Sequence, residues 1–180
     1  MIQVRQGVFE TNSSSTHSIC IPKKCDKIIN HVDFRIGKYG WENDEADPAS
    51  YLYTGILYAY KKDEAQELIN DIANILSTNG ISFTFEKPTW ETWGEYQYLE
   101  NGYVDHGEEL IPFIQAVVND EDTLLRYLSG GIVYTGNDNQ DPQPSGCDIC
   151  DEDYYDYDID KYVPNPYHDI ENYEYFYKGN

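Results

Sequence analysis

The chain contains four cysteines in two closely spaced pairs, an arrangement that can bind zinc. Four residues separate Cys20 from Cys25, and two residues separate Cys147 from Cys150. Structural zinc sites are tetrahedral and take their ligands from such pairs of thiolates. A zinc ion bound by all four cysteines would tie the C-terminal part of the chain to the N-terminal part. The spacing matches no standard zinc finger, so reduced cysteines without a metal are the alternative interpretation.

A second group of side chains would suit hydrolysis of a phosphoester if the fold brings them together. These side chains lie in three polar segments and are His17, Asp105, His106 and Asp138. Imidazoles and carboxylates in one cleft can hold a metal ion that activates water. Each segment also has a local explanation, because Asp105 can cap a helix and Asp138 suits a turn. This group defines an alternative function, a metal-dependent hydrolase or nucleotide-modifying enzyme.

The last part of the chain combines carboxylates with tyrosines in a pattern that predicts a binding surface for a basic protein. Residues 138–180 hold 12 acidic and 2 basic residues. A like-charge block of this kind is typical of a solvated interaction tail, and a tail that only aids solubility is the alternative. Spaced carboxylates can imitate phosphates, while tyrosine rings are frequent interface anchors. The predicted partner contacts are Asp151, Glu152, Asp153, Tyr154, Tyr155, Asp156, Tyr157, Asp158 and Asp160.

Helices are predicted where apolar residues repeat every three or four positions. The clearest helix starts at Asp63, and Gly80 just past its end can take the left-handed conformation that closes a helix. Asp47 and Pro48 form a typical helix start, and Asp120 is a suitable cap for another helix. The predicted helices cover residues 48–60, 63–79, 108–118 and 122–128.

Strands are predicted where apolar residues alternate with polar ones or form short runs. They cover residues 2–9, 19–21, 31–36, 81–85 and 131–135, and the last is expected to be the final core strand. Residues 88–103 are rich in aromatic and turn-forming residues, which favours a hairpin around Trp90 and Trp93. These rings suit either a dimer interface or the hydrophobic core, so the sequence is compatible with a homodimer and with a monomer.

Strands and helices follow one another without regular alternation, which predicts an α+β fold. We expect a mixed or antiparallel sheet with about three to four helices. The composition changes near residue 137, where a proline-bearing acidic stretch begins. The sequence therefore predicts a core domain at residues 1–137 and an acidic, tyrosine-rich segment at residues 138–180.

The net charge excludes several classes of function. The chain has 33 acidic and 12 basic residues, for a formal net charge of −21 at pH 7. This charge repels DNA, RNA and anionic membranes, and it attracts basic surfaces such as the grooves of nucleic-acid-binding proteins. Acidity that serves solubility alone is the alternative. We expect a protein partner, with no direct binding to nucleic acid or membrane.

The sequence also predicts where the protein resides. No stretch approaches the roughly 18 consecutive apolar residues of a membrane span. The N-terminus lacks the apolar core of a signal peptide, so a cytoplasmic location is expected. Nucleotide-binding glycine loops and common hydrolase motifs are absent, and the missing nucleotide-binding loop counts against a kinase or an NTPase.

Residues 5–18, with the sequence RQGVFETNSSSTHS, resemble the start of a family of phage and Firmicutes-type bacterial proteins. Similar points follow at residues 39–42, 51–54, 103–106 and 135–139, so the resemblance covers about residues 1–139. The family has no settled enzymatic activity, and the resemblance therefore implies no catalytic residues. Small size and acidity are also similar to type II-A anti-CRISPR proteins, which inhibit Cas9.

Charge and resemblance together predict a non-enzymatic inhibitor of a nucleic-acid-binding enzyme. The expected partner is Cas9 with its guide RNA, because Cas9 has a basic channel for nucleic acid and reads its target-adjacent motif with arginines. An acidic surface in that channel would block DNA binding or cleavage.

Overall fold

A computed structural model describes residues 15–24, 27–40, 45–94, 96–105, 110–137, 154–156, 161–163 and 171–178. The strand predicted at residues 2–9 lies outside these ranges. The chain forms an α+β fold, as the sequence predicts, with four helices and both antiparallel and parallel strand pairs among the described residues.

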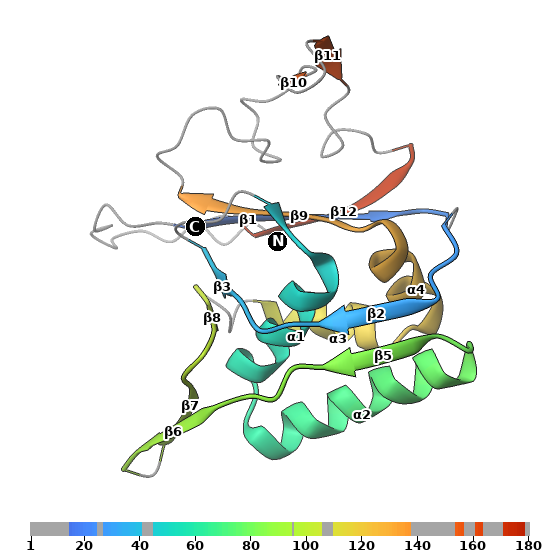
Figure 1. Cartoon of the computed structure of the whole chain (residues 1–180). Coiled ribbons are helices and arrows are strands. Elements are labelled where there is room, and N and C mark those ends of the chain that lie inside the picture. The colour runs from blue at the N-terminus through green and yellow to red at the C-terminus, as the bar shows by residue number, and fades with distance from the viewer. Residues whose placement is uncertain are drawn as a thin grey trace.

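The main sheet has four antiparallel strands in the order β12-β1-β9-β4 (Figure 1). Its strands are β12 (Tyr173–Lys178), β1 (Ser15–Pro22), β9 (Ile132–Asn137) and β4 (Glu45–Ala46). Strand β1 is central because it pairs along its length with both β9 and β12. Ile19, Cys20 and Ile21 are fully or almost fully buried, which explains why this stretch is uninterrupted by charge.

The acidic C-terminal part of the chain contributes one strand to this sheet. Tyr173 lies opposite Pro22 and Tyr175 opposite Cys20 in the β12–β1 register. The expectation that residues 131–135 form the final core strand is therefore wrong. The sequence of β12 is rich in tyrosine and phenylalanine, which favour strands strongly enough to offset nearby acidic residues. The division of the chain at residue 137 stays a prediction.

Helix α1 (Pro48–Ala59) occupies the centre of the fold. Every residue from Ala49 to Leu57 is buried, which fits a helix that is apolar on most of its surface. Asp47 caps the helix as predicted, because its carboxylate accepts a hydrogen bond of 2.9 Å from the Ser50 N–H. Figure 1 shows α1 beneath the main sheet, with α2 on its other side.

Helix α2 (Lys62–Thr78) is amphipathic, as its periodicity predicts. Ala65, Ile69, Ile72 and Leu76 are buried against the core. Each such apolar side chain contributes roughly 1.5–3 kcal/mol when removed from water, alanine less. Gly80 follows the helix with a φ of +69°, the left-handed conformation expected at this position.

Helices α3 (Ile111–Val118) and α4 (Glu121–Gly130) follow one another closely. Pro112 lies in the first turn of α3, where its missing N–H costs no helical hydrogen bond. Asp120 caps α4, because its carboxylate accepts a hydrogen bond of 2.7 Å from the Thr123 N–H. Both observations confirm the sequence-based helix starts to within a few residues.

Four two-stranded pairs complete the described structure. Strands β2 (His31–Phe34) and β5 (Ser82–Phe85) are parallel, as are β3 (Lys38–Tyr39) and β8 (Tyr103–Val104). Strands β6 (Trp90–Trp93) and β7 (Tyr96–Leu99) form the predicted hairpin. The last pair is antiparallel and joins β10 (Tyr154–Asp156) to β11 (Lys161–Val163).

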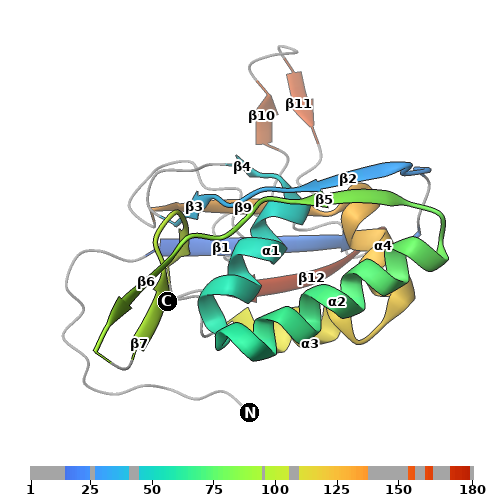
Figure 2. The same ribbon diagram turned by 60° about the horizontal axis from the view of Figure 1, so that its bottom comes forward.

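The β2–β5 pair and α2 cover sides of α1 that the main sheet leaves open (Figure 2). Phe34, Tyr53 and Phe85 pack together at this contact, with the Phe34 and Phe85 rings stacked at 4.5 Å between centroids. Among the described helices, none has the length and apolar character needed to cross a membrane.

Candidate functional site

The acidic tail residues predicted to bind a partner are only partly described. Tyr154, Tyr155 and Asp156 form β10, and Tyr155 lies opposite Tyr162 of β11. Six predicted contacts lie outside the described ranges: Asp151, Glu152, Asp153, Tyr157, Asp158 and Asp160. Partner binding through this segment therefore stays a prediction.

The predicted zinc ligands are described at one position. Cys20 lies in β1 and is completely buried in a small cluster with Tyr134, Ile132 and Tyr173. Burial raises the pKa of the Cys20 thiol to about 12. Cys25, Cys147 and Cys150 lie outside the described ranges. Within the described ranges, no cluster of three or more metal-binding side chains occurs. The zinc site stays a prediction.

The predicted hydrolase residues are likewise not assembled by the described part of the chain. His17 occupies a position in β1 opposite Thr135 and Lys178. Asp105 follows β8, and its N–H donates a hydrogen bond of 2.8 Å to the Tyr39 carbonyl. His106 and Asp138 lie outside the described ranges, so the convergence of these four side chains stays a prediction.

Helix α2 presents a row of carboxylates to solvent. Its apolar residues face the core, so Asp63, Glu64, Glu67 and Asp71 are left on the exposed side. Asp63, Glu67 and Asp71 follow one another at four-residue intervals. The helical rise places them on one face at intervals of about 6 Å along the axis.

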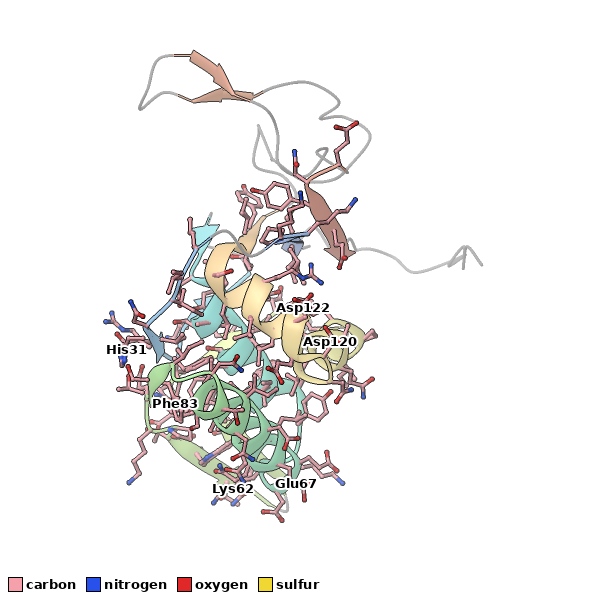
Figure 3. All side chains as sticks on the ribbon, turned by 90° about the vertical axis from the view of Figure 1, so that its right-hand side faces the viewer. His31, Lys62, Glu67, Phe83, Asp120 and Asp122 are labelled. Carbon is pink, nitrogen blue, oxygen red and sulfur yellow. The ribbon has the colours of Figure 1, made fainter. Side chains whose placement is uncertain are left out.

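The start of α4 adds three exposed carboxylates near the C-terminal end of α2, from Asp120, Glu121 and Asp122. The Asn79 side-chain amide at the end of α2 donates a hydrogen bond of 3.0 Å to Glu121 Oε1. Figure 3 shows Glu67, Asp120 and Asp122 on the side formed by α2 and α4. We call this surface the acidic face, and its residues are Asp63, Glu64, Glu67, Asp71, Asp120, Glu121 and Asp122.

The carboxylates of α2 form no ion pair within the described part of the chain, although Lys61 and Lys62 precede them in sequence. None of the ion pairs found there involves Asp63, Glu64, Glu67 or Asp71. Carboxylates four residues apart repel each other and destabilise a helix by roughly 0.2–0.5 kcal/mol per pair. Asp63 and Glu64 lie in the first turn of α2, where carboxylates stabilise the helix dipole. Glu67 and Asp71 lie beyond that turn, where lysine would stabilise the helix better, so helix stability alone does not explain these two acids.

The carboxylates at the start of α4 form hydrogen bonds and an ion pair, in contrast to those of α2. Hydrogen bonds from the Thr123 side chain and backbone lower the pKa of Asp120, so its carboxylate is charged at neutral pH. Asp122 lies 2.8 Å from the Arg126 guanidinium, which also lies 3.6 Å from Glu174 of β12. The acidic face thus combines hydrogen-bonded acids at the start of α4 with a row on α2 that forms no ion pair with the other described residues.

A row of hydrogen-bonded side chains crosses the exposed face of the β2–β5 pair. In the parallel register His31 lies opposite Ser82, and Asp33 lies opposite Thr84. His31 Nδ1 is 2.7 Å from Ser82 Oγ, and His31 Nε2 is 3.1 Å from Asp33 Oδ1. The Thr84 hydroxyl donates to Asp33 and is the first cause of the lowered pKa of that carboxyl.

Serine, histidine and aspartate in this order resemble a catalytic triad, but the geometry supports a structural ladder. The Ser82 hydroxyl donates to the Asn30 carbonyl at 2.9 Å, so its proton is not directed to His31. A cavity of about 400 Å³ beside β2 is lined by His31 and Asp33 but not by Ser82. Cross-strand hydrogen bonds of this kind stabilise a sheet.

Sequence reasoning missed both the acidic face and the ladder. For α2 a signal was present, because acids recur every four residues without lysine at the same spacing. For the ladder no local signal existed, because His31 and Ser82 are 51 positions apart and meet only through strand pairing.

No family model, curated protein or solved structure matches this chain in the three comparisons with known proteins. Fold and site together define an acidic α+β protein with a helical carboxylate surface. The resemblance to the phage and Firmicutes-type family stays a prediction.

Proposed function

We propose that this protein is an acidic inhibitor that binds the basic groove of a nucleic-acid-binding enzyme, with guide-loaded Cas9 as the partner to test first. The observation that carries the proposal is the acidic face. Its carboxylates are exposed and regularly spaced, and those of α2 have no ion-pair partner in the described ranges.

The chemistry of these carboxylates suits groups that normally bind phosphate. The α2 row offers one carboxylate about every 6 Å. One DNA strand offers one phosphate for each 3.4 Å or so of rise, so the row is sparser than a strand. The α4 acids add charge beside it. Arginine binds carboxylate and phosphate with the same paired hydrogen bonds, so a basic groove can accept either.

The rigidity of the acidic face favours binding. The opposite side of α2 is anchored in the core through Ala65, Ile69, Ile72 and Leu76. A row of charges on an anchored helix loses little conformational freedom when a partner binds. The remaining acidity of the chain, with a net charge of −21, accelerates encounter with a basic partner at low salt.

Cas9 is the first choice on chemical grounds and on the similarity in size and charge noted from the sequence. Its channel holds an RNA–DNA heteroduplex mainly through backbone contacts, and its arginines read a short duplex motif. An acidic protein that occupies either region would stop DNA binding or cleavage.

The test compares two variants with the same change in net charge. In the first, Asp63→Asn, Glu67→Gln and Asp71→Asn neutralise the α2 row. In the matched control, Glu91→Gln, Glu100→Gln and Glu171→Gln neutralise three exposed acids elsewhere. Binding to guide-loaded Cas9 and inhibition of DNA cleavage are measured for both across a salt series.

We expect the α2 variant to bind at least about tenfold more weakly than the control. Equal affinity of the two variants would show that the α2 row is not the interface. A third variant, with the six tail acids from Asp151 to Asp160 changed to asparagine or serine, tests the predicted tail contacts in the same assay. Absence of binding by the natural sequence at low salt would exclude Cas9 as the partner.

A further inference from the structure

A second cavity, of about 340 Å³, lies between α1, the start of α2 and the segment that joins β5 to β6. It is separate from the acidic face in its chemistry, because its lining is aromatic and basic. Tyr53, Phe85 and Trp90 supply aromatic surface, and Lys62, Lys87 and Gln66 supply polar groups.

The aromatic side of the cavity is rigid. Tyr53 is buried, and its hydroxyl donates a hydrogen bond of 2.7 Å to the Glu86 carbonyl. Its ring lies 5.2 Å from the Phe85 ring, and Trp90 packs against the same core. Burial raises the pKa of Tyr53 to about 12, so the phenol stays neutral at physiological pH. The cavity therefore has a preformed aromatic surface on which a flat ring can stack.

The charges around the cavity favour an anion. Lys62 and Lys87 are exposed, and neither takes part in an ion pair within the described ranges. Glu86 also lines the cavity, so two lysines face one carboxylate there, and the Glu86 Oε2 accepts a hydrogen bond of 2.9 Å from the Ile36 N–H. Within the described ranges, two lysines that form no ion pair are unusual in a chain with 33 acidic residues.

The side-chain amide of Gln66 can form a hydrogen bond with the edge of a bound aromatic base. Its Nε2 donates a hydrogen bond of 3.1 Å to Asn70 Oδ1, which orients the amide. The amide oxygen then remains as an acceptor. An aromatic wall, two cations and one oriented amide are the elements of a site for a flat, anionic ligand.

We propose that this cavity binds a nucleoside monophosphate, with the base stacked on Trp90 and the phosphate between Lys62 and Lys87. The volume lies at the lower end of the roughly 300–1,000 Å³ typical of ligand cavities, which suits a mononucleotide better than a dinucleotide. The net charge of −21 repels a polyanion, so a single phosphate group is favoured over a nucleic acid strand.

The test measures binding of four probes to the full chain by saturation-transfer NMR and calorimetry. The probes are AMP, adenosine, inorganic phosphate and a short single-stranded DNA. We expect AMP to bind with a dissociation constant of about 1 mM or tighter. Adenosine lacks the phosphate and phosphate lacks the ring, so both should bind at least about tenfold more weakly. No AMP binding at several millimolar, or tighter binding of the DNA than of AMP, would overturn the proposal.

Variants locate the site. Lys62→Gln with Lys87→Gln should weaken AMP binding at least about tenfold, whereas Lys38→Gln with Lys61→Gln removes the same charge outside the cavity and should change it less than about twofold. Trp90→Leu removes the stacking surface and should also weaken binding. Equal AMP affinity in the two lysine variants would overturn the assignment. The Asp63, Glu67 and Asp71 variant should still bind AMP, so this test is independent of the proposed inhibitor function.

Discussion

The side-chain amide of Asn79 donates a hydrogen bond of 3.0 Å to the carboxylate of Glu121, and this contact joins the end of α2 to the start of α4. The same amide also donates to the Ile75 carbonyl at 2.9 Å, so it is oriented from both sides. This contact links the C-terminal end of α2 to the acidic start of α4.

Replacing Asn79 with alanine should loosen the acidic face without unfolding the protein. Both hydrogen bonds are exposed, so the loss in unfolding free energy should stay below about 1 kcal/mol. If the two helices act together, affinity for the basic partner should fall a few-fold. Denaturant unfolding and a binding titration measure the two effects. Unchanged affinity would indicate that α2 acts alone.

The Asp120 cap should make the stability of α4 depend on pH. Its pKa is lowered in the folded state by Thr123, so its contribution is present above the ordinary pKa of aspartate and is lost as the pH falls through the lowered value. Asp120→Ala should lower the melting temperature at pH 7 more than at pH 3.

Asp120→Asn is the matched control, because asparagine caps a helix about as well as aspartate and does not titrate. This variant should keep most of the stability at pH 7 and lose the pH dependence that comes from residue 120. Thermal unfolding followed by circular dichroism between pH 3 and pH 7 provides the comparison. Parallel pH curves for all three proteins would contradict the assignment.

Buried tyrosines should make the fold sensitive to alkali. Burial raises the pKa of Tyr39 and Tyr53 to about 12, and it raises those of Tyr51 and Tyr127 further. Because the folded pKa values are raised, the stability is fully present below the ordinary tyrosine value near 10 and declines as the pH rises toward 12. Absorbance at 295 nm should show part of the tyrosines ionising only together with the loss of circular dichroism. Complete ionisation of a still folded chain would contradict this prediction.

Arg126 should contribute to stability mainly through one hydrogen bond. Its side chain is only 8% exposed, and its guanidinium donates a hydrogen bond of 2.8 Å to the Pro22 carbonyl at the end of β1. Its two ion-pair partners are more exposed, Asp122 at 80% and Glu174 at 46%, so both pairs are screened by solvent.

Arg126→Met should lower the unfolding free energy by about 1–3 kcal/mol, because the Pro22 carbonyl loses a charged donor. Asp122→Asn keeps that donor and should cost less than about 1 kcal/mol. Chemical denaturation of both variants measures the difference. A larger loss in the Asp122 variant would show that the ion pair dominates.

Local sequence patterns were sufficient to predict the four described helices and half of the described strands, and they missed β3, β4, β8, β10, β11 and β12. The repeat of Ala65, Ile69, Ile72 and Leu76 predicted α2, and Asp47 and Asp120 predicted two helix starts. These signals are local because a helix satisfies its hydrogen bonds within a few residues and exposes one face to the core. The net charge was also predictable from the sequence, since it depends on composition alone.

The pairing of distant segments was decided by the tertiary structure. Nothing near Tyr173 indicates that β12 lies beside β1, and nothing near His31 indicates that it meets Ser82. Strand pairing is specified by complementary surfaces on segments far apart in sequence, which a local pattern does not contain.

The acidic face and the proposed nucleotide cavity show the same difference between what the sequence determines and what the tertiary structure determines. The sequence by itself determined that the protein is strongly acidic and that α2 has a polar side rich in carboxylates. Only the tertiary structure set Glu121 beside Asn79, and Lys62 beside Trp90 at one cavity. Composition fixes the total charge of a chain, but packing of the apolar faces decides which charged and aromatic groups share a surface.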